Sequence, residues 1–75
     1  MSAQTIYMTC ADEGEAERIV KSLLEERLIA CGNILQAHKS LYHWQDKIEQ
    51  ASEVAVIMKS TSDKADELKS RISDL

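Results

Sequence analysis

The chain has 75 residues, of which 44% are hydrophobic and 29% are charged, a composition typical of one small globular domain rather than a disordered segment. Thirteen acidic residues against nine basic ones give a formal net charge of −4, and Phe is absent, so we expect neither a general nucleic-acid binder nor a base-stacking sheet. The chain has no run of about 18 apolar residues and no basic N-terminal region followed by an apolar stretch, so we expect no membrane span, no secretory signal and a cytoplasmic location.

The first part of the chain predicts a strand followed by a helix. Residues 4–10 alternate between two sets of side chains, as in a strand with two different faces. Asp12 can accept a hydrogen bond from the free amides of a helix start, and Glu15 can complete a capping box. An amphipathic helix is predicted over residues 13–29, which the chain leaves at Gly32. Its apolar stripe is Ala16, Ile19, Val20, Leu23, Leu24 and Leu28.

The second part predicts a long hairpin and a second helix. Residues 33–44 and 48–59 are rich in β-forming side chains and flank a polar break at residues 45–47. The apolar run at residues 54–58 is typical of a strand covered on both faces. Ser60, Thr61 and Ser62 offer N-caps for a last helix. The stripe of that helix is Ala65, Leu68, Ile72 and Leu75.

This β-α-β-β-α order predicts an α+β fold with an antiparallel sheet. It is the ferredoxin-like β-α-β-β-α-β plan with its final strand missing. In that plan the missing strand would lie beside the first one, whose bare edge would recruit a pairing partner. We therefore expect a single domain over residues 1–75 that is incomplete at its C-terminus.

Four stretches of the sequence resemble the CutA family, the divalent-cation tolerance proteins: MTCADEGEAERI, LLEERLIACGNI, SLYHWQDKIEQ and EVAVIMKST. The resemblance covers about residues 4–75, and Ser40-Leu41-Tyr42-x-Trp44 followed by Glu53 and Lys59 is fairly specific. It implies a ferredoxin-like fold in a tight trimer whose long hairpins wrap the neighbouring subunit. It also implies a link to copper and other divalent cations, and a likeness to trimeric nitrogen-signalling regulators, without an established enzymatic reaction.

The chain departs from the family pattern at four places, one of which is Ser60, where members usually have a threonine after Lys59. Gln36 and Ala37 stand where members often have Pro-Gly, and Asp46 stands where Gly is usual. The His-Pro-Tyr-x-x-Pro-Glu segment that normally follows is expected to be absent after Leu75. Its histidines belong to the copper site proposed for relatives, and Cys10 matches the cysteine of that site. The resemblance therefore leaves Cys10 as a metal candidate without its partner histidines.

The two cysteines are predicted to differ in reactivity. Cys10 follows a strand and precedes a helix start, which would lower the pKa of its thiol and favour the thiolate that binds soft metals. The alternative is a buried structural thiol. Cys31 is expected to pack in the core, and no disulfide is expected. No cofactor is certain from the residues, and the resemblance points to copper or another divalent cation.

The hairpin carries the remaining candidates. His38 and His43 are an odd number of residues apart, so they face opposite sides of one strand and cannot chelate a single ion there. Tyr42 and Trp44 share a face and are predicted to anchor a subunit interface. The alternatives are one wall of an intersubunit ligand pocket, with Glu53 and Lys59 supplying charge, or a solvated face for those charges.

These observations favour a non-enzymatic function. Neither a glycine-rich phosphate loop nor an HExxH or GxSxG motif occurs, and a thiol enzyme would need a histidine close to a cysteine. We predict a homotrimeric divalent-cation tolerance protein that responds to metal ions, with no nucleic-acid or membrane partner. The alternatives are a small-ligand sensor or regulatory module resembling the nitrogen-signalling trimers, and a purely structural trimeric scaffold.

Overall fold

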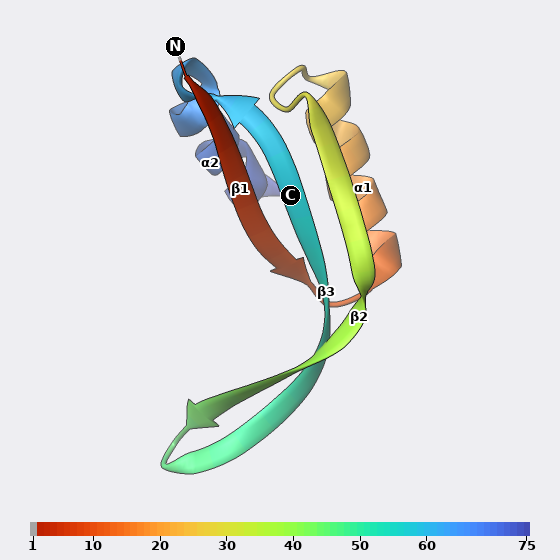
Figure 1. Cartoon of the computed structure of the whole chain (residues 1–75), viewed down its shortest axis with the longest axis vertical. Helices are drawn as coiled ribbons and strands as arrows, with labels where there is room; N and C mark the ends of the chain where they lie inside the picture. Colours follow the sequence, from red (N-terminus) through yellow and green to blue (C-terminus); the bar gives the residue numbers. More distant parts are fainter. Residues whose placement is uncertain (1) are drawn as a thin grey trace.

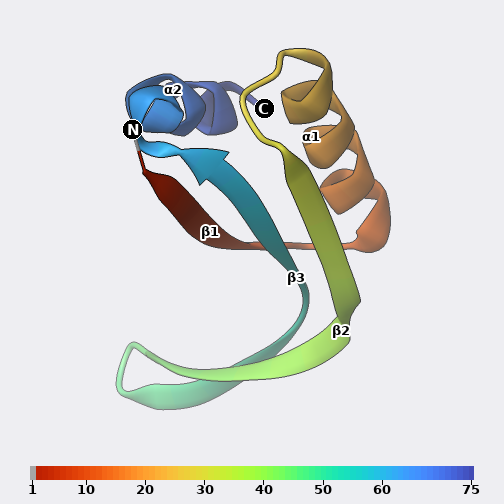
Figure 2. The same ribbon diagram turned by 45° about the horizontal axis from the view of Figure 1, so that its top comes forward.

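The computed structural model describes residues 2–75, which form one antiparallel sheet with two helices on the same face (Figures 1 and 2). In chain order the elements are β1 (Ala3–Cys10), α1 (Glu13–Glu25), β2 (Cys31–Trp44), β3 (Lys47–Thr61), the 3₁₀ turn η1 (Ser62–Lys64) and α2 (Ala65–Asp74). The strand order is β1-β3-β2. The predicted α+β class and the β-α-β-β-α order are confirmed.

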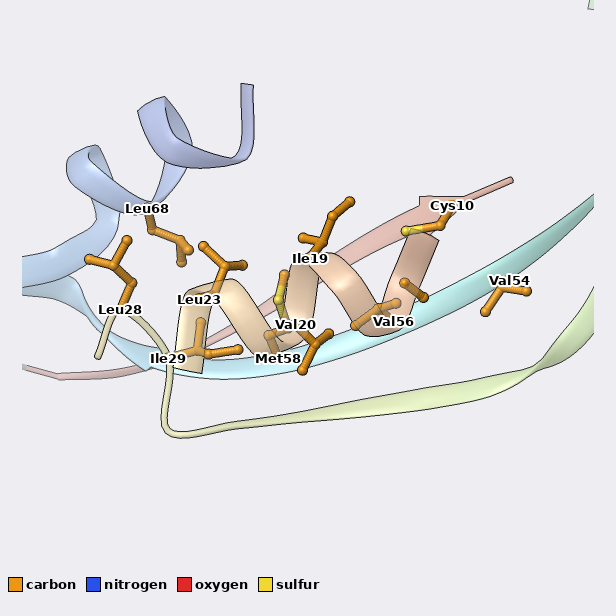
Figure 3. Close-up of a cluster of buried hydrophobic side chains, with 11 residues drawn as sticks. Cys10, Ile19, Val20, Leu23, Leu28, Ile29, Val54, Val56, Met58 and Leu68 are labelled. Carbon is orange, nitrogen blue, oxygen red and sulfur yellow. The ribbon is translucent and has the colours of Figure 1, made fainter. Parts of the chain in front are cut away.

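β3 is the central strand, and the helices lie on one of its faces. The cover on both faces predicted from its apolar run is not found within the described residues, because Ile57 lies on the uncovered face. It pairs with β1 from Ala3↔Thr61 to Cys10↔Val54, and with β2 on its other side. Because β1 and β2 are both antiparallel to β3, they run in the same direction, and α1 forms the crossover between them. Figure 3 shows the resulting core between the helices and the sheet. Its buried members include Cys10, Ile19, Val20, Leu23, Leu28, Val56, Met58 and Leu68.

The start of α1 forms the predicted cap with one change. Asp12 Oδ1 accepts a hydrogen bond from the Glu15 amide at 2.8 Å. Glu15 Oε1 in turn accepts from the Ala11 amide at 3.2 Å, one residue ahead of the cap. The two acidic side chains therefore hold the turn between β1 and α1 in place.

The end of α1 corrects the predicted helix, because α1 stops at Glu25 and not at residue 29. Arg27 adopts the left-handed conformation with φ of 59°, its amide donates to Leu24 O, and the Leu28 amide donates to Leu23 O, each at 3.0 Å. This is the bonding pattern of a Schellman cap. Leu28 is buried beyond the helix as the hydrophobic residue that accompanies such a cap.

Gly32 has a packing role rather than the predicted capping role. It lies in β2, where a Cβ would come within 2.7 Å of Val20 Cγ1. The glycine therefore lets α1 lie directly against β2.

A β-bulge turns the β2–β3 hairpin into a projecting arm. The ladder runs to Ile34↔Val56 and resumes at Ala37↔Val54, so two residues of β2 oppose the single residue between these partners on β3. Beyond the bulge the two strands curve away from the helices (Figures 1 and 2). The arm ends in a two-residue turn at Gln45 and Asp46, whose φ angles of 49° and 63° are those of a type I′ turn. The predicted break is confirmed, with Lys47 already in β3.

The predicted N-caps of the last helix are wrong. No side chain caps η1 or α2. Ser60 Oγ instead donates to Leu28 O at 2.6 Å inside the core, and Ser62 Oγ accepts from the Ser2 amide at 3.0 Å. These serines are therefore used to fasten the end of β3 to the rest of the fold.

Candidate functional site

The Cys10 thiol lies at the junction of β1 and α1 and is only 4% exposed. Burial raises the pKa of this thiol above its ordinary value of 9.0, and the carboxylates of Glu15 and Asp12 raise it further, while Arg18 lowers it. The predicted lowering of the pKa is therefore wrong. The acidic residues that cap α1 bring negative charge to the thiol, and burial acts in the same direction.

The groups around Cys10 do not make a complete copper site. A soft metal needs several thiolate or imidazole donors, whereas the neighbours of Cys10 are carboxylates. Glu15 Oε1 and Asp12 Oδ1 also already accept backbone hydrogen bonds. Within residues 2–75, no group of three or more His, Cys, Asp or Glu side chains is placed to hold a metal ion. Cys10 thus offers one protonated sulfur ligand.

Cys31 corrects another prediction, because its thiol is exposed rather than packed in the core. It is the first residue of β2 and pairs with Lys59. Ahead of the bulge, Gly32 and Ile34 face the helices, so the alternation of the strand turns Cys31 to the uncovered face. The two thiols are free and lie on opposite faces of the sheet.

The histidines are distant from both thiols. His38 pairs with Glu53 and His43 pairs with Ile48 in an uninterrupted part of the ladder, so the two imidazoles lie on opposite faces as predicted. His38 and the buried Cys10 also lie on opposite faces of the sheet. Cys31 lies on the same face as His38 but about 20 Å along the strand. His43 lies on the same face as Cys10, but their partners on β3 are six residues apart, about 20 Å. The described residues therefore hold no thiol–imidazole pair suited to nucleophilic catalysis.

The predicted pocket residues share a face but are spread along it. Tyr42 pairs with Glu49 and Trp44 pairs with Lys47, near the tip of the arm. Glu53 lies nearer the bend and accepts a hydrogen bond from Ser40 Oγ at 3.0 Å. Lys59 lies six residues further along β3, about 20 Å from Glu53.

One chain does not gather Tyr42, Trp44, Glu53 and Lys59 into a pocket, and a pocket between subunits stays a prediction. The arm instead exposes large apolar side chains on both of its faces. Tyr42 and Trp44 are 44% and 61% exposed on one face, and Leu41 and Ile48 are 67% and 70% exposed on the other. An arm with two apolar faces is suited to lie against other protein surfaces.

Sequence reasoning missed a basic cleft at the other end of the sheet. Arg27, Lys59 and Lys64 line a cleft of about 820 Å³ where α1 and β3 end. Arg27 is more than thirty residues from Lys59 and Lys64 in sequence, so the fold brings its loop beside theirs. Neither helix in the described part of the chain is long and apolar enough to cross a membrane.

Comparison with known proteins identifies the family. The model for the family described as CutA1 divalent ion tolerance protein matches residues 4–75. The divalent-cation tolerance protein CutA of Pyrococcus horikoshii is 49% identical over 70 residues, which are 93% of this chain and 68% of that protein. The CutA protein of Thermococcus kodakarensis is 39% identical over 75 residues, which are 100% of this chain and 71% of that protein.

Solved structures have the same fold. The divalent ion tolerance protein CutA1 of Ehrlichia chaffeensis superposes with a TM-score of 0.92 at 36% identity, covering 97% of this chain and 68% of that one. The Archaeoglobus fulgidus protein described as a periplasmic divalent cation tolerance protein CutA has a TM-score of 0.89 at 43% identity, covering 96% of this chain and 70% of that one. The chain thus spans about two thirds of the length of these relatives, and it belongs to the CutA1 divalent ion tolerance protein family.

Proposed function

We propose that the protein is a homotrimeric divalent-cation tolerance protein that acts in the response to metal ions by binding and assembly rather than by catalysis. The family supports the link to divalent cations, since its curated members carry that name. The observation that supports the assembly of subunits is the projecting arm, which has apolar side chains on both faces.

The shape of the chain supports this interpretation. A compact domain of 75 residues has a radius of gyration of about 11 Å. The value here is 13.7 Å, and the molecule measures 41 × 23 × 21 Å. Ordering such an arm costs conformational entropy, which burial against a partner would offset. Two arms could supply much of the roughly 1,600 Å² that a standard stable interface buries. The number of three subunits follows from the family resemblance.

Sedimentation equilibrium at micromolar concentration tests the assembly. We expect the mass of three chains for the wild type. Trp44→Ala should cost about 3–5 kcal/mol of combined folding and assembly free energy if the ring is buried between subunits, and the mass should then depend on concentration. Lys47→Ala, across the ladder from Trp44, is the matched control and should leave the mass unchanged. A monomeric wild type would refute the proposal. A Trp44→Ala variant with unchanged mass and melting temperature would show that the ring stays exposed.

The metal contact is proposed at Cys10 because of the family resemblance. A single buried thiol per chain implies weak copper(I) binding at most, since the remaining donors must come from elsewhere. We expect Cys10→Ser to remove this binding and Cys31→Ser to retain it, in a competition titration against a copper(I) chelator. Cys31 is the more accessible thiol. If Cys31→Ser removes the binding and Cys10→Ser does not, the assignment to Cys10 is wrong.

We also propose a cytoplasmic location, since both cysteines are free thiols, as is usual in a reducing compartment. The Archaeoglobus fulgidus relative is described as periplasmic, so the two compartments are direct alternatives. Fractionation of cells producing the protein distinguishes them. Recovery in the periplasmic fraction would contradict the proposal.

A further inference from the structure

The outer edge of β1 is open to a further strand. β1 lies at one side of the sheet, and among residues 2–75 only β3 pairs with it. The Ser62 amide donates to Ser2 O at 2.8 Å, which makes these two residues a hydrogen-bonded pair. Because such pairs alternate along an antiparallel ladder, the amides and carbonyls of Thr5, Tyr7 and Thr9 point away from β3. These backbone groups are therefore available to another strand.

This edge carries none of the features that protect edge strands from pairing. Such edges are commonly blunted by charged side chains, by proline or by a bulge. The eight residues of β1, AQTIYMTC, include no charged residue and no proline, and their register with β3 is unbroken. The edge is therefore suited to accept a strand from another chain.

An apolar groove of about 310 Å³ lies beside the open edge, between β1 and α2. Its lining includes Ile6 from β1 and Leu68 and Ile72 from α2, and Ile6 and Ile72 are only partly buried. A strand added to β1 would place alternate side chains in this groove. Its other side chains would lie on the uncovered face, where Tyr7 is 62% exposed. The best partner is therefore a strand that is apolar on both faces.

The arm of a second copy meets this requirement. Its β2 strand exposes Leu41 on one face and Tyr42 and Trp44 on the other, and β2 is the second edge strand of the sheet. Residues 40–44 of β2 include no acidic residue, lysine or arginine, whereas residues 47–53 of β3 include three. Charges along an edge oppose strand addition. The β2 side of the arm is therefore the better donor.

The β1 strand of a second copy fits the edge less well. Antiparallel pairing of two identical strands would put both helix layers on the same side of the sheet. A second α2 would then compete for the space beside the groove, which the first α2 already lines. The arm is a ribbon of two strands that carries no helix (Figures 1 and 2).

We propose that the β2 strand of the arm of one copy adds to the open edge of β1 in the next copy. Leu41 enters the groove, and Tyr42 and Trp44 lie on the same face as Tyr7. These four are among the seven large apolar side chains that residues 2–75 leave exposed. Main-chain hydrogen bonds supply affinity, and the side chains supply specificity.

This pairing rests on the proposed trimer and names the surface that each arm engages. It joins two different surfaces, so it is a heterologous contact, which can close into a ring of identical subunits. Each copy then gives one arm and accepts another.

Amide hydrogen exchange of the 75-residue protein, measured residue by residue by NMR, tests the pairing. The amides of Thr5, Tyr7 and Thr9 should exchange at least about tenfold more slowly in the wild type than in Leu41→Lys, because the groove cannot hold an unpaired charge. Ile48→Lys makes the same change on the same face of the arm but on β3, so it is the matched control and should keep the slow exchange.

A second variant removes a backbone donor from the edge. Thr5→Pro deletes an N–H that points away from β3, so the ladder with β3 should remain. In sedimentation equilibrium this variant should dissociate at concentrations at which the wild type is assembled. Thr5→Val keeps the N–H and should keep the wild-type mass.

The outcomes separate this pairing from the proposed trimer. A trimeric mass with rapid exchange at Thr5, Tyr7 and Thr9 would overturn the pairing and leave the trimer standing, whereas a monomeric wild type would overturn both. Equal loss of slow exchange in Leu41→Lys and Ile48→Lys would overturn the assignment to β2. If Thr5→Pro does not fold, the comparison of the two lysine variants still decides.

Discussion

Replacing Gly32 with alanine measures how closely α1 packs on β2. The new Cβ would lie 2.7 Å from Val20 Cγ1 and 3.2 Å from Cγ2, and real Cβ atoms do not approach other atoms as closely as the first distance. Val20 is 5% exposed and β-branched, so its methyl groups have little room to move. Overpacking of this kind costs about 1–3 kcal/mol, whereas the loss of glycine flexibility in the unfolded chain returns about 0.4–1 kcal/mol. We expect a net loss of roughly 1–2 kcal/mol.

A double-mutant cycle with Val20→Ala attributes the loss to this contact. Val20→Ala alone removes two methyl groups, worth about 1.6 kcal/mol of burial before any cavity term. In the double variant the alanine at position 32 enters the vacated space, so the two losses should fall short of additivity by about 1 kcal/mol or more. The measurement is urea unfolding at one fixed protein concentration, because assembly would otherwise alter the apparent stability.

Gly14→Ala is the matched control for the same chemical change. The nearest atom to its new Cβ is Asp12 Oδ1 at 3.3 Å, on an exposed side chain. This variant should therefore change stability by less than about 1 kcal/mol. Strictly additive losses in the cycle, or a neutral Gly32→Ala, would refute the argument that Gly32 is required by close packing.

Two further variants test local features of the fold. Asp46→Gly should raise the free energy of unfolding by up to about 1 kcal/mol, since a left-handed conformation strains an L residue and not glycine. An unchanged urea midpoint would mean that the turn is not strained. Ser60→Ala should lower stability by about 1–3 kcal/mol, because it leaves the Leu28 carbonyl without its buried donor. Thermal melting of this variant at fixed concentration provides the measurement, and an unchanged melting temperature would show that water replaces the hydroxyl.

The order of elements could be read from the sequence because it depends on local periodicity. The alternation of residues 4–10 and the 3–4-residue spacing from Ala16 to Leu23 both correspond to observed elements. The end of α1 could not be read in this way. Leu28 continues the helical spacing although it lies beyond the cap, and Arg27 gives no sign of its left-handed backbone, which glycine more often adopts.

The environment of the candidate site depends on which residues of β2 and β3 pair with each other. The sequence did not determine this register. The bulge after Ile34 carries neither Gly nor Pro in this chain, so the only sign of the change of face along β2 was the Pro-Gly that family members often have in place of Gln36 and Ala37. The exposure of Cys31 follows from its place in the alternation of β2. The basic cleft was missed for a related reason. Arg27, Lys59 and Lys64 line one cleft only because β3 ends beside the cap of α1.

The surroundings of Cys10 give the stability of the protein a defined dependence on pH. Because the folded chain raises the pKa of this thiol, the folded state holds the proton more tightly than the unfolded state does. The contribution is fully present below the unfolded pKa, near 9.0, and is lost as the pH rises towards the higher folded value. Chemical unfolding between about pH 8 and 11 should thus show a steeper loss of stability in the wild type and in Cys31→Ser than in Cys10→Ser. The three proteins contain the same lysines and tyrosines. The contribution of those side chains to the pH dependence therefore cancels when the proteins are compared. Equal pH dependence in the three would refute the proposed environment.

The same proton must leave before a metal can bind the sulfur, so the carboxylates that cap α1 and the burial of the thiol both weaken metal binding by Cys10 at neutral pH.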